Sequence, residues 1–362
     1  DSSGALIHAV TYFGACYKDE WRSGGGWSME MTDTGNPFNA PDTWRASVDP
    51  SGGTPGRNNS LDIPAPDTQC PEIIAAYPLN IASIRIVFDE TVTGAFIPNE
   101  WDIDGIRAEV AVSDDIADRA IVIILREPLT AGRVYMVTMP MTVSDFAGRV
   151  PCMPAVSLGL PGQPFAGDIL FNEILFDPVT PCSDYIELYN NSDKIVDLSL
   201  LFLSSSPDNV TKGSPALALS TLPRQLLPGR YVALTTGRDV IADYYSCSDR
   251  QEIHQVRSLP SMPDDEGGVV LLDREMNILD RMYYRSTDHM DYLTVKEGIA
   301  LEKVSPELPS GYSFNWHSAS ELCNWGTPGA RNSAVLSDNS GEYGLSLSSE
   351  RISPDGDGFE DV

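Results

Sequence analysis

The stretch that decides the fold is residues 167–203, GDILFNEILFDPVTPCSDYIELYNNSDKIVDLSLLFL. It contains three apolar runs, residues 169–176, 185–189 and 195–203, which are rich in β-branched and aromatic residues. Turn-forming residues separate the runs: Asp-Pro and Pro-Cys-Ser-Asp after the first, Asn-Asn-Ser-Asp after the second. This pattern predicts three consecutive β-strands joined by a loop and a turn.

The segments NEILFDP, DYIELYNNS and VDLS of this stretch resemble the opening of the lamin tail domain. That resemblance implies an immunoglobulin-like β-sandwich, but it implies no particular activity, because one fold hosts many functions. The 29 glycines, 27 prolines and many short apolar runs also favour β-rich modules. We therefore expect an all-β chain of tandem immunoglobulin-like β-sandwich modules.

Length and charge restrict the function further. A chain of 362 residues is expected to hold two or three domains. Its 24 basic and 52 acidic residues give a net charge of −28, which argues against nucleic acid or an anionic membrane as partner. No apolar run reaches about 18 residues, so we expect no membrane insertion. We interpret the acidity as solubility of an exported protein, with cation binding as the alternative.

The sequence contains an internal repeat. Residues 6–47 align without a gap onto residues 278–319, at an offset of 278 − 6 = 272. One inserted residue later, the segment Gly-Thr-Pro-Gly at 53–56 meets the same segment at 326–329. The shared residues include Tyr12 and Tyr284, Gly26 and Gly298, Glu30 and Glu302, Pro37 and Pro309, Trp44 and Trp316, Asn59 and Asn332, and Ser60 and Ser333. Such agreement indicates two copies of one structural unit.

Both copies resemble the closing half of a lamin tail domain. The copy at 165–335 is complete, and we expect residues 169–203 to supply strands to residues 204–333. The copy at 1–62 is a C-terminal half, and since 167 − 272 is −105, we expect roughly a hundred residues before residue 1. A half-sandwich exposes strand edges, so it is expected to stay partly disordered or to borrow a partner.

Residues 63–160 are predicted to form a separate module. Residues 81–87 alternate as in a half-buried strand, residues 120–125 are continuously apolar, and residues 135–139 close the series. The segments SIRIVFDETV and VSDFAGR resemble a bacterial Ig-like domain of the SbsA-like type, which implies a spacer or adhesive unit. Residues 336–362 are interpreted as a linker and the truncated start of a C-terminal Ig-like or sorting-type domain, on the resemblance of Ser-Pro-Asp-Gly-Asp-Gly.

Six cysteines permit fifteen full pairings, and none lies in a Cys-x-x-Cys unit. Cys70 and Cys152 bracket the Ig-like module, so we expect a disulfide between them, worth about 4 kcal/mol in the chain-entropy model. Cys182, Cys247 and Cys323 leave one unpaired thiol, and Cys16 is expected to have no partner in its half-domain. The alternative is free thiols in a reducing compartment, but export fits better.

No catalytic motif is present: the four histidines are scattered, and no Gly-x-Ser-x-Gly or phosphate-binding loop occurs. We therefore expect no enzyme and no cofactor. Glu173, Glu187 and Glu302 lie on predicted lamin-tail strands, where they are candidates for a glycosidase-type carboxylate pair. The structural alternative is that they bond backbone groups or face solvent.

Calcium is the one ion that the sequence suggests. Asp355, Asp357 and Asp361 have the alternating spacing of oxygen ligands in calcium loops, with glycines between them. The acidic turn at residues 264–267 is a second candidate, with an exposed loop as the alternative. Residues 236–245 are expected to form a short helix capped by Thr236.

A group of aromatic residues is a candidate binding platform for carbohydrate or protein: Tyr283, Tyr284, Tyr292, Trp316 and Trp325. In a sandwich most of them should instead lie in the core. We expect a non-catalytic structural or adhesive protein, secreted or on the bacterial cell surface, which contacts an unknown protein or glycan. The alternatives are accessory modules of a secreted hydrolase whose catalytic domain lies outside residues 1–362, and a carbohydrate-binding module.

Overall fold

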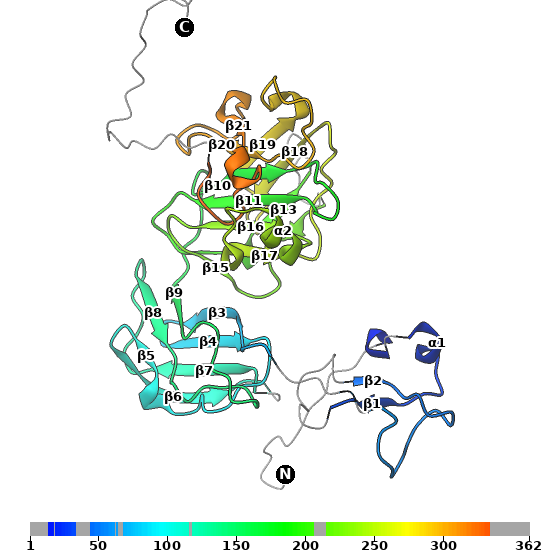
Figure 1. The fold of residues 1–362 in the computed structure, drawn as a ribbon. Coiled ribbons are helices and arrows are strands. Elements are labelled where there is room, and N and C mark those ends of the chain that lie inside the picture. The colour runs from blue at the N-terminus through cyan, green and yellow to red at the C-terminus, as the bar shows by residue number, and fades with distance from the viewer. Residues whose placement is uncertain are drawn as a thin grey trace, which may run out of the picture.

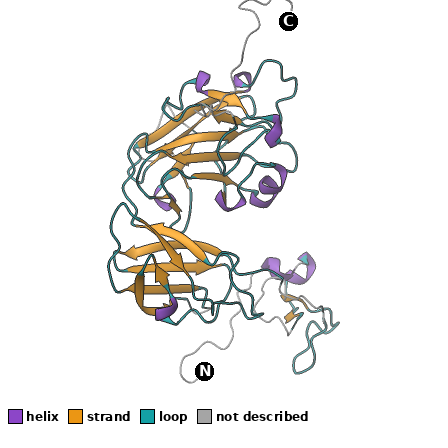
Figure 2. Ribbon diagram, turned by 60° about the vertical axis from the view of Figure 1, so that its left-hand side comes forward, coloured by secondary structure: helices purple, strands orange, loops and turns teal. Residues whose placement is uncertain are grey.

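The computed structural model describes residues 14–17, 19–33, 44–61, 63, 68–115, 118–205 and 215–333. Within these ranges the chain is built from β-strands in five sheets, with short helices between them (Figure 2). The all-β prediction is therefore confirmed. No helix in the described ranges is long and apolar enough to cross a membrane.

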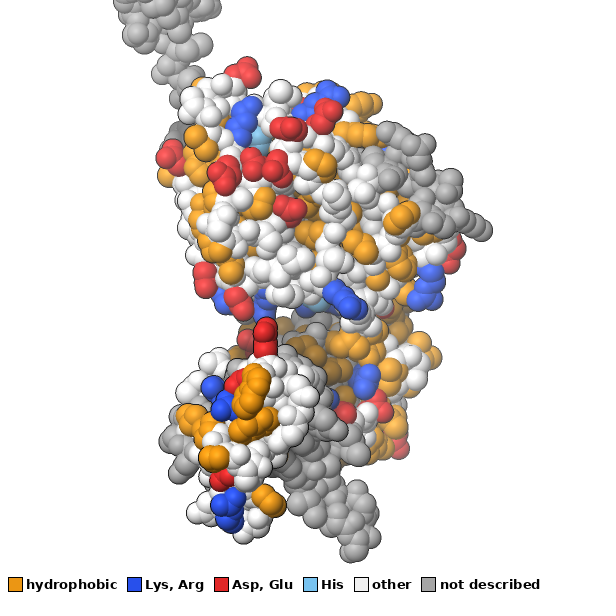
Figure 3. Space-filling view, turned by 90° about the vertical axis from the view of Figure 1, so that its right-hand side faces the viewer, with side chains coloured by type: hydrophobic (Ala, Val, Ile, Leu, Met, Phe, Trp, Pro, Cys, Tyr) orange, Lys and Arg blue, Asp and Glu red, His pale blue; other side chains and the backbone are white. Residues whose placement is uncertain are grey.

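The N-terminal module, residues 14–63, has one small sheet. Strand β1 (Met29–Met31) pairs antiparallel with β2 (Trp44–Ala46), next to helices η1 (Gly14–Tyr17) and α1 (Glu20–Ser23) (Figure 1). Asp19 caps α1 by accepting a hydrogen bond from the backbone N–H of Arg22 at 3.0 Å. Hydrophobic side chains lie on the surface of this module, which is in front in Figure 3, and Trp21 is 72% exposed.

The middle module contains one sheet of seven strands in the order β3-β4-β7-β6-β5-β8-β9. Its core is formed by side chains with no exposed surface, among them Ile84, Trp101, Ile123 and Val137. The strands are β3 (Ile73–Asn80), β4 (Ser83–Phe88), β5 (Asp102–Ile103), β6 (Ile106–Ser113), β7 (Ala120–Leu125), β8 (Val134–Thr138) and β9 (Ala155–Gly159), with η2 (Pro98–Glu100) before β5.

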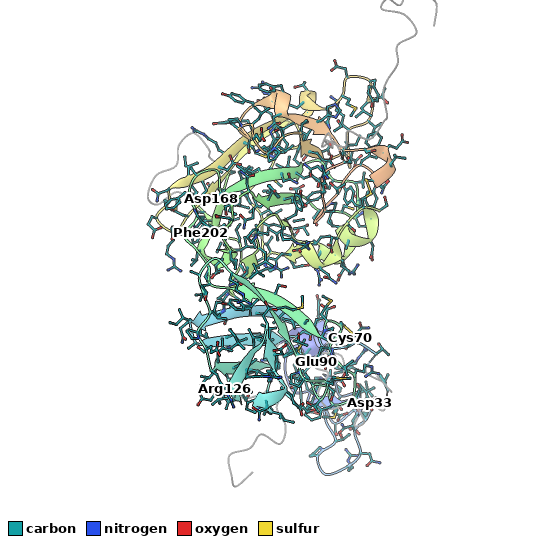
Figure 4. All side chains as sticks on the ribbon, turned by 90° about the vertical axis from the view of Figure 1, so that its left-hand side faces the viewer. Asp33, Cys70, Glu90, Arg126, Asp168 and Phe202 are labelled. Carbon is teal, nitrogen blue, oxygen red and sulfur yellow. A yellow bond between two sulfur atoms is a disulfide. The ribbon has the colours of Figure 1, made fainter. Side chains whose placement is uncertain are left out.

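A disulfide joins Cys70 to Cys152, the pair expected from the sequence. Each cysteine lies three residues before a terminal strand of the seven-stranded order, β3 and β9. The backbone N–H of Cys152 also donates to Pro71 O at 3.1 Å. The disulfide thus connects the first and last strands of the sheet to each other. In Figure 4, Cys70 is labelled in this module, and Asp168 and Phe202 are labelled in the part of the chain that follows it.

The C-terminal module, residues 169–333, has two larger sheets. The six-stranded sheet has the order β17-β16-β11-β10-β20-β21, and the four-stranded sheet has the order β14-β13-β18-β19. The strands of the first are β10 (Ile169–Leu175), β11 (Tyr185–Asn190), β16 (Tyr231–Thr235), β17 (Ile253–Gln255), β20 (Leu301–Lys303) and β21 (Trp316–Ser318). Those of the second are β13 (Phe202–Ser204), β14 (Leu217–Ala218), β18 (Glu266–Leu272) and β19 (Ile278–Arg285).

The two sheets share one apolar core, because Phe171 and Ile186 of the first pack in one cluster with Val269 and Met282 of the second. The opposite face of the six-stranded sheet is also covered: Tyr185 packs in a cluster with Ile241 of helix α2 (Arg238–Tyr244). This double coverage explains why every residue of β10 is buried.

The strand pairings confirm that residues 169–203 supply strands to residues 204–333. β10 pairs with β20, β11 with β16, and β13 with β18. The third apolar run is not one strand, however. It splits into β12 (Val196–Asp197), helix η3 (Leu198–Leu200) and β13, because the Asp197 side chain accepts from Ser199 N at 2.9 Å and starts the helical turn. β12 pairs with β15 (Gln225–Leu226) in a sheet of its own.

The predicted cap of the helix at 236–245 is wrong. The N-cap residue of α2 is Gly237, and no side chain caps it. The Thr235 side chain, one residue before Thr236, accepts from the Gly237 N–H at 3.3 Å instead. A second disulfide, Cys247–Cys323, leaves Cys182 as the unpaired thiol of this module and Cys16 as that of the first.

Replacing both Cys70 and Cys152 by serine should lower the free energy of unfolding of the middle module by about 4 kcal/mol, because the denatured chain loses a long closed loop. Urea unfolding of the full chain measures this loss. Cys182→Ser is the matched control, since Cys182 is unpaired. An unchanged unfolding midpoint in the double variant would contradict the role assigned to this disulfide.

Candidate functional site

Three glutamates lie side by side on adjacent strands of the six-stranded sheet. The register places Glu173 of β10 opposite both Glu187 of β11 and Glu302 of β20. All three side chains have no exposed surface. The structure thus brings together the three carboxylates that the sequence singled out. We call Glu173, Glu187 and Glu302 the carboxylate cluster.

A bulge in β10 helps to build the cluster. The register between β10 and β11 shifts between Phe171 and Glu173, so Asn172 is the extra residue. Asn172 Nδ2 donates to Glu187 Oε1 at 2.6 Å and to Asn332 Oδ1 at 2.6 Å. The bulge therefore lets Asn172 and Glu173 turn their side chains toward the same part of the chain, residues 326–333, which we call the closing loop.

Hydrogen bonds from the closing loop satisfy Glu173. Its Oε1 accepts from the backbone N–H of Thr327 at 2.9 Å and from the Tyr185 hydroxyl at 2.7 Å. Glu187 binds the same loop through its Oε2, which accepts from the Gly329 N–H at 2.5 Å. A carboxylate that accepts hydrogen bonds from backbone N–H groups anchors a loop whose N–H groups have no strand to pair with.

The Thr327 hydroxyl lies between two carboxyl groups. Its Oγ1 is 2.8 Å from Glu302 Oε1 and 3.2 Å from Glu173 Oε2. Ser333 Oγ holds the other oxygen of Glu302 at 2.8 Å. Because a hydroxyl has a single hydrogen, it donates to one carboxyl, and the other contact needs a protonated carboxyl as the donor. The geometry favours at least one neutral glutamate in the cluster.

The pKa shifts of the glutamates agree with at least one neutral carboxyl group in the cluster. Burial, and then the negative charge of Glu302, raise the pKa of Glu173 to about 8. Burial, and then the neighbouring Glu173, raise the pKa of Glu187 well above its usual range. Like charges on adjacent strands cannot all ionise when none of the carboxyl groups is exposed to solvent.

This geometry supports the structural alternative for the glutamates. A glycosidase pair needs two carboxyl groups that flank a sugar bond and leave room for the substrate. Here each side chain is fully buried and bonded to the chain's own closing loop. The cluster holds the loop to the sheet. Sequence reasoning missed Thr327 and Ser333 as its partners, although the repeated Thr-Pro-Gly segment contained the signal.

The N-terminal module contains a second copy of part of the cluster. Glu30 of β1 is 4% exposed, and its carboxylate accepts from Thr54 Oγ1 at 2.5 Å, from Ser60 N at 2.7 Å and from Ser60 Oγ at 2.6 Å. The two hydroxyl contacts, from Thr54 and Ser60, match those that Glu302 receives from Thr327 and Ser333. The alignment of the two sequence copies therefore holds at the level of single hydrogen bonds.

The predicted calcium ligands Asp355, Asp357 and Asp361 lie outside the described residues. Within the described ranges, including the turn at 264–267, no group of three His, Cys, Asp or Glu side chains could hold a metal ion.

The five aromatic residues do not form one platform. Tyr284 and Trp316 are buried in the core, whereas Tyr283 is 37% and Tyr292 is 73% exposed. Tyr292 and Trp325 line a shallow surface pocket of about 300 Å³ together with Val295, Glu297 and neighbouring residues. Of the aromatic candidates, Tyr292 and Trp325 are those that the structure brings to one open site.

No protein-family model matches the chain, and no curated protein matches it significantly. Among solved structures, it resembles the N-terminal part of the bacterial S-layer protein SbsC at 15% identity and a TM-score of 0.24, covering 47% of this chain and 41% of that one. A second SbsC structure, domains 1–6, is similar at 10% identity and a TM-score of 0.23, covering 60% of this chain and 41% of that one.

A DUF4876 family protein from Bacteroides thetaiotaomicron VPI-5482 is similar at 10% identity and a TM-score of 0.25, covering 72% of this chain and 84% of that one. The chain spans about two fifths of the length of the S-layer chains that it matches. At such identities and TM-scores, the likeness assigns neither a family nor an activity.

The carboxylate cluster makes stability depend on pH. Because the folded-state pKa of Glu173 is raised to about 8, its contribution is present at low pH and is lost as pH rises toward 8. Burial lowers the pKa of His254 and His289 to about 4, so their titration acts below pH 6.5. Between pH 6.5 and 8 we therefore expect Glu173 alone to cost the C-terminal module roughly 2 kcal/mol, and Glu187, whose pKa is also raised, to add to this loss.

Calorimetry of the full chain at a series of pH values measures this loss. Glu173→Gln should flatten the pH dependence, because glutamine stays neutral. Glu275→Gln is the control, since Glu275 is an exposed glutamate. A wild-type profile without slope, or a slope that Glu173→Gln leaves unchanged, would show that the cluster does not bind protons as described.

Proposed function

We propose that the chain is a non-catalytic structural or adhesive multi-module protein of the bacterial cell surface or secretome, which contacts a protein or a glycan. The main observation in support is the use of the carboxylate cluster. Acid–base chemistry would need carboxyl groups open to a substrate, and here all three are enclosed and bonded to the closing loop. The polar groups serve to hold strands and loops together.

The module resemblances support the same proposal. We interpret residues 165–335 as a lamin-tail-like domain, supported by two sheets with a shared core and by the repeated contacts of Glu30 and Glu302. We interpret residues 63–160 as a bacterial Ig-like domain of the spacer kind. The domain limits 1–62, 63–160, 165–335 and 336–362 remain predictions from the sequence.

The disulfides support export. Two pairs, Cys70–Cys152 and Cys247–Cys323, each close a long stretch of chain. Such bonds persist in oxidising compartments and are rare in the cytosol. The net charge of −28 supports a protein or glycan partner over nucleic acid, since phosphate binding needs clustered basic residues.

The proposal is tested with the folded full chain. Incubated with p-nitrophenyl glycosides and esters, it should release no more product than buffer. Intact cells that produce the protein should be labelled by an antibody raised against residues 68–333. Hydrolysis that disappears in Glu173→Gln would overturn the non-catalytic proposal in favour of an enzyme, and labelling of lysed cells alone would overturn the surface location.

A carbohydrate-binding role is a second candidate, and the pocket at Tyr292 favours it. Asn324 and Trp325 both have positive φ angles, 56° and 68°, a conformation that costs energy in residues other than glycine. Asn324 Nδ2 donates to Tyr244 O at 2.8 Å, which stabilises this turn. The turn places Trp325 in the pocket with Tyr292 and Glu297, an arrangement of aromatic and acidic groups that suits a sugar.

A glycan array tests this second candidate. Tyr292→Ala should abolish any signal, because it removes the most exposed aromatic ring of the pocket. Tyr312→Ala is the matched control: Tyr312 is 51% exposed and stacks on Phe314 rather than lining the pocket. Equal signals from the two variants, or no signal from the wild type, would exclude the pocket as a glycan site.

A further inference from the structure

The N-terminal module reproduces the local structure of the closing loop and its two strands. Glu30 lies opposite Arg45 in the β1–β2 pair, as Glu302 lies opposite its β21 partner in the β20–β21 pair. Asn59 Nδ2 donates to the carbonyl of Met31 at 2.7 Å. The equivalent residues of the two modules are Glu30 and Glu302, Met31 and Lys303, Thr54 and Thr327, Gly56 and Gly329, Asn59 and Asn332, and Ser60 and Ser333.

The two loops differ in burial although their sequences and internal contacts agree. Thr327, Gly329 and Asn332 are buried in the C-terminal module. Their counterparts are not: Gly56 and Asn59 are exposed, and Thr54 is half-buried. The difference arises because β20 has two neighbours, β10 and β21, whereas among the described residues β1 has β2 alone.

The two loops also differ in the hydrogen bonds that their backbone N–H groups make. In the C-terminal module the N–H groups of Thr327 and Gly329 donate to Glu173 and Glu187 of strands β10 and β11. In the described part of the N-terminal module, the N–H groups of Thr54 and Gly56 have no acceptor. Two backbone donors with a spacing of two residues thus lie beside β1, which pairs with β2 alone among the described residues.

We propose that residues 14–63 bind a β-hairpin of the kind that β10 and β11 form. Its inner strand pairs with the open edge of β1 and contains an Asn-Glu pair, whose glutamate accepts from Thr54 N–H. Its outer strand contains a glutamate opposite the first, which accepts from Gly56 N–H. Strand addition at an open edge supplies backbone hydrogen bonds, and the two carboxyl groups supply specificity.

The occupant is a hairpin other than β10 and β11. β10 and β11 lie in the middle of the six-stranded sheet, between β20 and β16, and their glutamates are bonded to the closing loop (Figure 1). Releasing them would expose a core that is buried on both faces. A second copy of the chain therefore does not donate its β10 and β11 without unfolding the C-terminal module.

The experiment uses a peptide of residues 167–191 with Cys182→Ser as the probe. Labelled with fluorescein and titrated against the full chain, it should show saturable binding by anisotropy. Glu173→Ala and Glu187→Ala peptides should each bind about tenfold more weakly, because a backbone donor of the protein is then left unsatisfied. The Asp177→Ala peptide is the control: it loses a carboxylate in the loop between the strands and should bind as the parent does.

Variants of the protein locate the site. Thr54→Ala removes the hydroxyl that holds the loop to Glu30 and should weaken peptide binding about fivefold. Thr327→Ala makes the same change in the module whose site is filled, and should leave peptide binding unchanged while lowering the stability of that module. Hydrogen exchange should slow at residues 29–31 and 54–60 when the peptide binds.

Four results would overturn the proposal. They are the absence of saturable binding, equal affinity of the parent, Glu173→Ala and Glu187→Ala peptides, slowed exchange confined to residues 68–333, and a concentration-dependent dimer that protects residues 29–31 without any peptide. The last would identify a second copy of the chain as the occupant. None of these results bears on whether the chain is an enzyme, so the proposed function stands or fails separately.

Discussion

The burial of three carboxyl groups on adjacent strands is the constraint on which the C-terminal module depends. A charged or polar group removed from water costs several kcal/mol unless it is bonded, and side-by-side carboxylates also repel one another. The structure meets both costs locally. Backbone and hydroxyl groups of the closing loop satisfy the oxygens, and raised pKa values keep charge low. The sheet supplies the acceptors for the N–H groups of the closing loop, and the loop supplies the donors for the buried carboxyl groups of the sheet.

The same constraint explains the order of the strands. β10 lies between β11 and β20, so a segment near residue 173 and a segment near residue 302 meet although about 130 residues separate them. The bulge at Asn172 then turns one more polar side chain toward the closing loop, where it pairs with Asn332. The apolar core lies on the other face of these strands, between the two sheets. One face of the sheet thus provides apolar packing, and the other combines the carboxylate cluster with a second apolar cluster that includes Tyr185 and Ile241.

Sequence reasoning predicted a good part of this arrangement. The apolar runs of β10 and β11, the continuous run of β7, and the supply of strands by residues 169–203 follow from patterns of period two and from turn residues. These predictions were wrong where a single local polar contact determines the backbone conformation. Asp197 starts a helical turn inside an apolar run, and α2 begins after Gly237 without a side-chain cap. Such contacts depend on atoms that periodicity does not describe.

By itself the sequence determined the all-β class, the internal repeat and the three glutamates, because each is written in residue type and spacing along one chain. Only the tertiary structure decided what the glutamates do. As isolated residues they are compatible with a catalytic pair and with a structural contact. What separates these two roles is whether a substrate can reach the carboxyl groups. Folding places the closing loop over Glu173, Glu187 and Glu302 and leaves the matching loop of the N-terminal module uncovered. Whether a carboxyl group is buried depends on what packs over it, and no residue pattern shows that.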